Sequence, residues 1–239
     1  GQDAKVAANR ELGTLKALIN QCKTWGIYAS ENPVAKVRFF PEPRGKERIV
    51  TPDEEATLLA AAKEPLRTVI LTGLYAGLRV ASEALTLRWA DVDLARRVLT
   101  VQSAHAKSGK RRTVPINTVL HDALSRLAEG AGPEDFVFRH RNGRRVREMA
   151  SSFTRLCHRL GIVDVTPHCL RHTFASRLVM AGTDLETVRE LGGWANLSMV
   201  QRYAHPSPQH KADAVERIGQ PGRDIKPTAE KVVPLTALQ

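Results

Sequence analysis

Apolar residues recur at the three- to four-residue spacing of a helix along most of the chain. In residues 5–28, Leu12, Leu15, Ile19 and Cys22 fall on one side of a helix, and a Glu-Asn-Pro segment at 31–33 ends that pattern. The same spacing predicts further helices at about 52–62, 65–89, 117–128, 147–160, 167–181, 184–192 and 198–204.

Several of these helices carry a recognisable start signal. Thr51 can cap a helix that has Pro52 at its first position, and Glu54 completes a capping box. Similar starts are predicted at Thr166-Pro167 and at Thr183 with Glu186.

Two short segments have the pattern of strands instead. Residues 98–101 and 113–116 are rich in β-branched residues and flank a basic turn at 105–112, which predicts a β-hairpin. The fold class expected from the whole pattern is therefore mainly α, with a small antiparallel β-sheet or hairpin.

Composition divides the chain into three parts. The stretch 41–48 is rich in Pro, Gly and charge, as linkers are, and residues after Ile218 show no clear period. We therefore expect a helical unit at 1–44, a main domain at 45–218 and a tail at 219–239. Because the chain begins inside a helical pattern, we also expect native sequence before Gly1.

The charge balance indicates a polyanionic partner. The 239 residues carry 36 Lys and Arg against 25 Asp and Glu, a formal net charge of +11. DNA, RNA and an acidic membrane surface would each satisfy that charge. No apolar run is long enough to span a bilayer, and no signal peptide pattern is visible. The three scattered cysteines, Cys22, Cys157 and Cys169, make a disulfide framework improbable and favour a reducing cytoplasm.

Two small clusters have the chemistry of a phosphate site. His168 and Arg171 share one face at a predicted helix start, where the helix dipole favours anions. Arg79 follows an apolar helix and has Glu83 nearby as a partner, so it is expected to be buried beside that partner or a ligand. A solvated basic helix end and a purely structural Arg–Glu pair are the alternatives.

The remaining candidates are a lysine and a tyrosine. Lys107 lies in the predicted hairpin turn and could protonate a leaving alkoxide, although a loop lysine is usually solvated surface. Of the three tyrosines, Tyr75 lies among core leucines and Tyr28 lies in the first unit. Tyr203, among polar neighbours, is predicted to be the one exposed to substrate. Basic residues that could contact phosphates are Lys110, Arg111, Arg112, Arg144 and Arg145.

Taken in order, these residues resemble the signature of the tyrosine recombinase (phage integrase) family. An Arg, a Lys, His-x-x-Arg, Leu-Gly-x-Trp and a Tyr nine residues later follow one another, and the resemblance covers about residues 5–210. It implies that fold and the catalytic residues Arg79, Lys107, His168, Arg171, Trp194 and Tyr203, with Glu83 as acidic support. The chain departs from many members in its Arg79–Glu83 spacing of four and in carrying Trp194 where His is usual.

The resemblance also implies the reaction. Tyr203 would attack a DNA phosphodiester to form a 3′-phosphotyrosyl link, so strands can be rejoined without ATP. Arg79 and Arg171 would clamp the phosphate oxygens, Lys107 would be the general acid and His168 a candidate base. No metal or other cofactor is expected. A zinc site is disfavoured, because the Cys and His residues that lie close in sequence lack a Cys-x-x-Cys pair: Cys157, His158, His168, Cys169 and His172.

The resemblance further implies the binding partners and the cellular location of the protein. Residues 1–44 resemble the end of a core-binding domain, and members act on double-stranded DNA as tetramers on two paired sites. Accessory DNA-bending proteins are also expected, in a prokaryotic or phage-encoded protein of a mobile genetic element that acts at the nucleoid. The tail at 219–239 is a candidate for docking onto a neighbouring protomer, and a disordered tail is the alternative. The alternatives are a type IB topoisomerase and a non-catalytic DNA-binding module.

Overall fold

The computed structural model describes residues 2–41, 48–106, 109–140 and 142–203. The chain divides into two compact units, residues 1–46 and 47–239.

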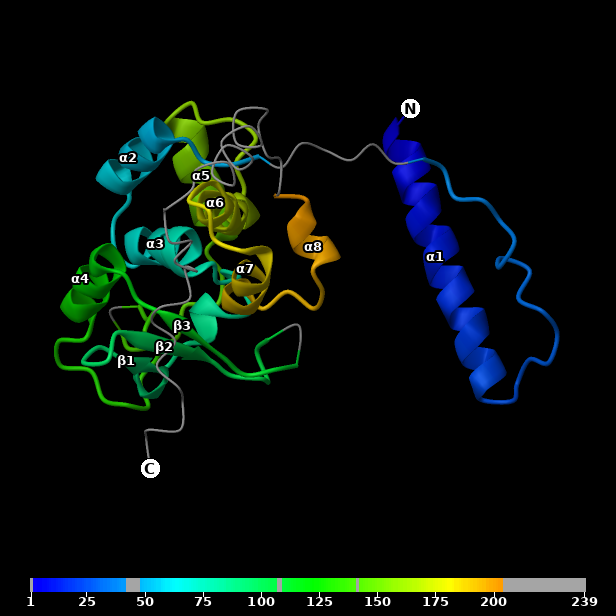
Figure 1. Ribbon diagram of the computed structural model, residues 1–239, viewed down its shortest axis with the longest axis horizontal. Helices are drawn as coiled ribbons and strands as arrows, with labels where there is room; N and C mark the ends of the chain where they lie inside the picture. The colour runs from blue at the N-terminus through cyan, green and yellow to red at the C-terminus, as the bar shows by residue number, and fades with distance from the viewer. Residues whose placement is uncertain (1, 42–47, 107–108, 141, 204–239) are drawn as a thin grey trace, which may run out of the picture. The chain divides into compact units, whose positions relative to one another are not determined.

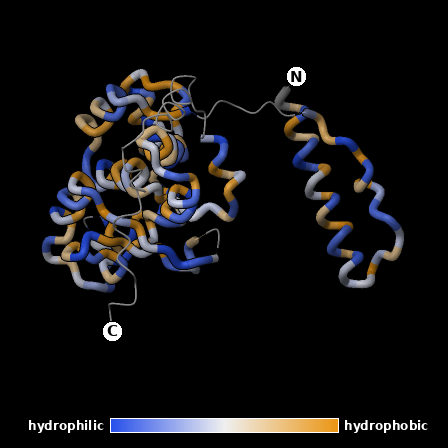
Figure 2. Tube along the Cα trace, in the orientation of Figure 1, coloured by the Kyte–Doolittle hydropathy of each residue, from blue (hydrophilic) through white to orange (hydrophobic). Residues whose placement is uncertain are grey.

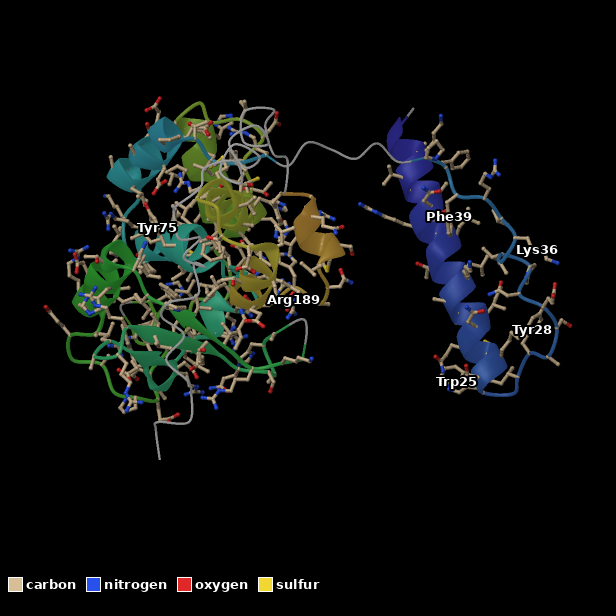
Figure 3. All side chains as sticks on the ribbon, viewed as in Figure 1. Trp25, Tyr28, Lys36, Phe39, Tyr75 and Arg189 are labelled. Carbon is tan, nitrogen blue, oxygen red and sulfur yellow. The ribbon has the colours of Figure 1, made fainter. Side chains whose placement is uncertain are left out.

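The first unit is one long helix with a return segment. Helix α1 spans Gln2–Thr24, so it ends four residues before the predicted limit. The return segment is tied to α1 by Asn9, which exchanges two 2.9 Å hydrogen bonds with the backbone of Phe40. Hydrophobic and hydrophilic residues alternate along α1 (Figure 2), and large apolar side chains such as Trp25 and Phe39 are well exposed (Figure 3).

The second unit is mostly helical, with a three-stranded antiparallel sheet beside the helices (Figure 1). The sheet has the order β1-β2-β3, formed by Val92–Asp93, Val98–Val101 and Arg112–Pro115. The fold class expected from the sequence is confirmed. The helices are α2 Pro52–Ala61, α3 Leu66–Ala76, α4 Thr118–Leu127, α5 Ala150–Arg159, α6 Pro167–Met180, α7 Leu185–Gly192 and α8 Ser198–Gln201, with two 3₁₀ turns at Ala84–Thr86 and Trp89–Asp91.

Helix α3 is the centre of the core, because it is apolar on nearly every side. It packs closely on α6, and Gly73 allows this: a Cβ there would lie 2.7 Å from the Cβ of Leu170. The apolar residues of α3 and the β2 residue Leu99 belong to one buried cluster. The helix that carries His168 and Arg171 is therefore held against the middle of the core.

The predicted helix at 65–89 is wrong beyond Ala76. Gly77 adopts a left-handed conformation with φ 63° and ends α3, and a Cβ at this position would lie 2.4 Å from the ring of Phe174. An irregular loop follows and carries Arg79 and Glu83. This break decides where the first candidate arginine lies.

The helix starts are mostly as predicted. The capping box of Thr51 and Glu54 is present, and Thr166 precedes Pro167 at the start of α6. The start predicted at Thr183 is wrong, because Asp184 caps α7 and accepts from the backbone N–H of Thr187 at 2.8 Å. Among the described residues, none of the helices has the length and apolar character needed to cross a membrane.

Candidate active site

Glu83 is the central hydrogen-bond acceptor of the candidate site. Its side chain is fully buried and accepts from the Arg79 backbone N–H at 2.9 Å and from Arg79 Nη1 at 2.6 Å. Arg79 and Glu83 are four residues apart, a spacing that departs from the family pattern, and their hydrogen bonds join the two ends of the loop that follows α3. Glu83 becomes the anchor for the arginine that precedes it.

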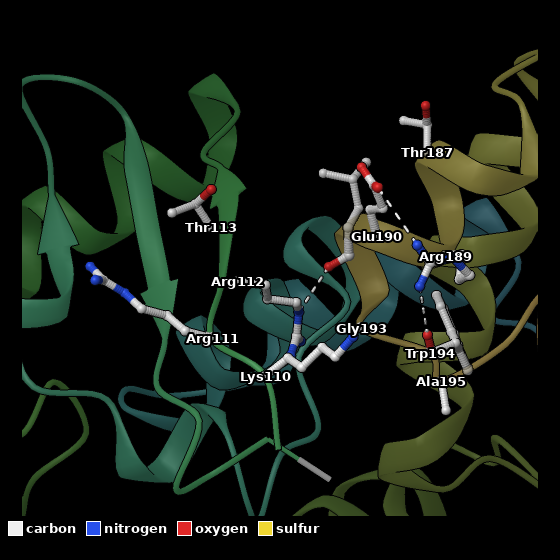
Figure 4. Close-up of a pocket in the computed structure, with 11 residues that line it drawn as sticks. Lys110, Arg111, Arg112, Thr113, Thr187, Arg189, Glu190, Gly193, Trp194 and Ala195 are labelled. Atoms are coloured by element: carbon white, nitrogen blue, oxygen red, sulfur yellow. Dashed lines mark hydrogen bonds and ion pairs between the residues drawn. The ribbon is translucent and has the colours of Figure 1, made fainter. Parts of the chain in front are cut away.

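A second arginine reaches Glu83 from the sheet. Arg112 of β3 donates from Nη1 and Nη2 to the two Glu83 oxygens at 3.1 and 2.8 Å, in the paired geometry that guanidinium and carboxylate favour. Its Nε donates to the carbonyl of Leu191 on α7 at 3.0 Å (Figure 4). Only 9% of the Arg112 side chain is exposed and its guanidinium is bound by Glu83 and Leu191, so the contact with DNA at a hairpin tip stays a prediction. The residue joins the sheet, the Glu83 loop and α7.

Arg171 of α6 is the third arginine and is 1% exposed. Its Nη1 donates to the carbonyl of Gly77 at 2.6 Å and lies 3.8 Å from Glu83 Oε2. Its Nη2 is buried and has no hydrogen-bond partner among the described residues. A buried N–H group without an acceptor lowers the stability of the fold unless a ligand accepts its hydrogen bond.

The cluster holds more positive than negative charge. Burial, followed by the nearby charge of Arg79, lowers the pKa of Arg171 to about 9, which still leaves it protonated at neutral pH. Burial would raise the pKa of Glu83, but hydrogen bonds and charge from Arg112 outweigh it and lower that pKa overall. Three guanidinium groups therefore surround one carboxylate, and the site attracts an anion.

Trp194 connects this cluster to the tyrosine. The Arg171 guanidinium carbon lies 4.1 Å from the centroid of the Trp194 ring, and the Tyr203 ring lies 5.7 Å from it on centroids. The indole fits only because residue 192 is glycine: a Cβ there would come within 1.7 Å of the ring. The Leu-Gly-x-Trp segment thus positions an aromatic ring between arginine and tyrosine.

Tyr203 is largely buried, with 7% of its surface exposed, whereas the sequence predicted an exposed residue. Its hydroxyl lies 2.5 Å from Nδ1 of His172, a residue that sequence reasoning had considered only as a zinc ligand. The signal that could have found His172 is its place one helical turn after His168 and beside Arg171.

His168 is exposed and lines a pocket together with Arg79 and Arg171. The pocket also includes residues 147–150 and the start of α6. The structure therefore brings Arg79, His168 and Arg171 together at one opening, and the buried Glu83 binds Arg79 there. Trp194 and Tyr203 are not among the described residues that line this pocket, but ring contacts join them to Arg171.

The other basic candidates have different surroundings. Lys107 lies outside the described residues, and Lys110 and Arg111 are exposed next to β3. Arg144 is exposed, whereas Arg145 is half-buried, donates to the carbonyl of Leu85 at 2.7 Å and stacks 5.2 Å from Phe136. Within the described part of the chain, no group of three or more His, Cys, Asp or Glu residues could hold a metal ion.

A family model decides what kind of protein this is. The model described as the phage integrase family matches residues 48–210, which contain every residue of the site. The chain belongs to the phage integrase family. The family expected from the order of the motifs is therefore confirmed.

Curated relatives of this integrase-family chain are integrases and tyrosine recombinases. It is 31% identical to the integrase of Salmonella phage P22 over 87% of its own length and 56% of that protein. It is 32% identical to a tyrosine recombinase of Thermosipho africanus, over 88% of its length and 75% of that protein. These names do not favour the topoisomerase alternative.

Solved structures share the fold. The Tn1549 transposon integrase in complex with transposon right end DNA matches with a TM-score of 0.74 at 22% identity, over 89% of this integrase-family chain and 79% of that one. The catalytic domain of bacteriophage HP1 integrase matches with a TM-score of 0.54 at 28% identity, over 71% and 94%. The second unit thus has the tyrosine recombinase catalytic fold.

Proposed function

We propose that the protein cuts and rejoins double-stranded DNA at specific sites through a covalent link between Tyr203 and a 3′-phosphate. The observation that carries this is the orphan Nη2 of Arg171, buried in an arginine cluster whose aromatic neighbour Trp194 contacts Tyr203. Membership of the phage integrase family supports the same reaction.

The arginine cluster suits a phosphodiester under attack. Three guanidinium groups against one carboxylate leave an excess of two positive charges, and a phosphodiester gains negative charge as a nucleophile adds to it. Arg79, with 18% of its side chain exposed, faces the pocket and can donate to one phosphate oxygen while Arg171 donates to another. His168 adds a third donor from the pocket wall. A preorganised donor of this kind typically contributes about 3 kcal/mol to lowering the barrier.

The covalent step needs no energy source. The Tyr203 oxygen forms a bond to phosphorus while the bond from phosphorus to the 5′-oxygen breaks, and the 5′-oxygen takes up a proton. We assign that proton to Lys107 on the family pattern. Reversal with a different 5′-hydroxyl rejoins the strands, because the phosphotyrosyl link keeps the energy of the phosphodiester.

A basic groove beside the pocket supports DNA as the partner. Arg147 and Glu148 line both the catalytic pocket and a second, more open pocket that includes His140 and Arg144. The two pockets are therefore neighbours, and a DNA backbone held at Arg171 can continue toward Arg144. Phosphate contacts of this kind position DNA without reading its sequence.

The wider assembly follows from the family. We assign residues 1–44 to the end of a core-binding domain and 45–218 to the catalytic domain, and we propose that tetramers act on two paired sites, with accessory DNA-bending proteins and with the tail 219–239 docked on a neighbouring protomer. The tail lies outside the described residues. The action would take place at the nucleoid of a prokaryotic cell.

The test is covalent capture. The protein is incubated with nicked suicide duplexes made from a candidate attachment site, and adducts are separated on a denaturing gel. We expect an adduct with the native protein, none with Tyr203→Phe, and an undiminished one with Tyr28→Phe, whose hydroxyl donates to the Glu31 carbonyl at 3.3 Å in the first unit. An adduct that persists in Tyr203→Phe would contradict the proposal.

A further inference from the structure

The contact between His172 and Tyr203 has no role in the reaction described so far. His172 lies on α6 with 9% of its surface exposed, and its Nδ1 is 2.5 Å from the Tyr203 hydroxyl. The two ring centroids are 5.6 Å apart. A buried imidazole nitrogen at hydrogen-bond distance from a nucleophile has the geometry of a general base.

We infer that His172 is a further catalytic residue, which takes the proton of Tyr203 as the phenol attacks the phosphate. This rests on the proposed function. Neutral His172 carries its proton on Nε2 and accepts through Nδ1, becoming an imidazolium as the bond between oxygen and phosphorus forms. The 5′-oxygen leaves with a proton from the general acid. In rejoining, a 5′-hydroxyl attacks and gives its proton back to the general acid, the bond from phosphorus to the tyrosine oxygen breaks, and Nδ1 returns its proton to the phenolate.

His172 is placed for this role better than His168, which the sequence favoured. His168 is exposed and lines the pocket with Arg79 and Arg171, where it can donate to a phosphate oxygen. The two imidazoles meet edge to face at 4.4 Å, one helical turn apart. The structure thus divides the two tasks between them: His168 faces the phosphate opening, and His172 faces the nucleophile.

The surroundings help the proton to move. A free phenol has a pKa near 10 and a free imidazole near 6.5, so transfer is unfavourable before attack begins. The excess positive charge of the arginine cluster favours the phenolate, and the forming bond to phosphorus lowers the basicity of the oxygen. Proton transfer to His172 is therefore expected to accompany attack and not to precede it.

The experiment measures single-turnover cleavage of the nicked suicide duplex by His172→Asn. Asparagine can keep a hydrogen bond to the phenol but cannot take its proton. We expect a rate loss of roughly 10²- to 10⁴-fold, as removal of a general base gives. Urea unfolding and DNA retention on a native gel check that the variant is folded.

A second measurement separates a base from a residue that merely positions Tyr203. When residue 203 is replaced by 3,5-difluorotyrosine, whose phenol ionises more readily, the loss caused by His172→Asn should shrink at least tenfold. A loss that the fluorinated residue leaves unchanged, or a His172→Asn rate within threefold of the native rate, overturns the inference.

The outcome also distinguishes the two proposals. If the native protein forms no adduct, the proposed function fails and this inference falls with it. If the native protein and His172→Asn form adducts equally fast, only the inference fails. Should His172→Asn not fold, the pH dependence of cleavage by the native protein decides. A rate that rises with pH in direct proportion to the phenolate fraction of Tyr203 shows that no base acts, and a rate that levels off before the phenol ionises supports His172.

Discussion

At the scale of single residues, Glu83 determines the geometry of the candidate site. Its two oxygens receive hydrogen bonds from Arg79 and Arg112, and Arg171 lies 3.8 Å away. Removing one partner of a buried ion pair is strongly destabilising, because the remaining charge is left uncompensated. Here one carboxylate compensates several guanidinium groups at once.

Glu83→Gln is therefore expected to destabilise the protein by about 3 kcal/mol at pH 7. The pKa of Glu83 is lowered in the folded state, so its contribution is fully present above the unfolded pKa near 4.5 and is lost as the pH falls through the lower folded value. Urea unfolding at a series of pH values should show the native protein and the variant converging below pH 4.5. Glu129→Gln, at an exposed position, is the matched control; a gap that stays constant on acidification would contradict the expectation.

At the scale of elements, the contact of α3 with α6 positions the site. Gly77 ends α3 and lies against Phe174 of α6, and the loop that begins there carries both Arg79 and Glu83. Arg171 of α6 donates back to the Gly77 carbonyl. One glycine thus combines a helix end, a helix-to-helix contact and the start of the loop that carries two residues of the candidate site.

Gly77→Ala should cost about 3 kcal/mol of unfolding free energy. About 1 kcal/mol comes from a left-handed backbone that carries a Cβ, and the rest from overpacking against Phe174. Gly161→Ala is the control, because its φ of 70° is similar but no atom lies within 4 Å of the added Cβ. Equal losses in the two variants, measured by urea unfolding, would show that the Phe174 contact costs nothing.

At the scale of the whole molecule, charge governs the partner. The formal net charge of +11 is distributed over the chain, but the exposed arginines Arg144 and Arg147 line the groove next to the pocket of the candidate site. Binding through such residues releases counterions from DNA and so weakens with salt.

The logarithm of the DNA association constant should fall linearly with the logarithm of salt concentration. Arg144→Gln and Arg147→Gln should each reduce that slope by about 0.9, the value for one phosphate contact. Fluorescence anisotropy with a labelled duplex measures it. Arg126→Gln, exposed on α4 and outside the groove, should leave the slope unchanged; a similar change in all three variants would assign no special role to the groove.

Local order was largely predictable from the chain alone. The capping box at Thr51, the start of α6 at Thr166 and the hairpin strands depend on residues a few positions apart, whose interactions hold in almost any fold. The order of the motifs was likewise enough to identify the family. It also selected Arg79, His168 and Arg171, which line one pocket in the folded chain. The helix end at Gly77 was missed, because apolar spacing continues past it while the backbone turns.

Pairings between distant residues became visible only in the folded chain. Arg112 and Glu83 are 29 residues apart, and His172 and Tyr203 are 31 apart, so no local rule joins them. Whether a basic or aromatic side chain meets solvent or a buried partner depends on how α3, α6, α7 and the sheet pack together. Spacing along the chain therefore specified which groups this protein carries, while packing assigned Arg112 to Glu83 and the Tyr203 phenol to His172.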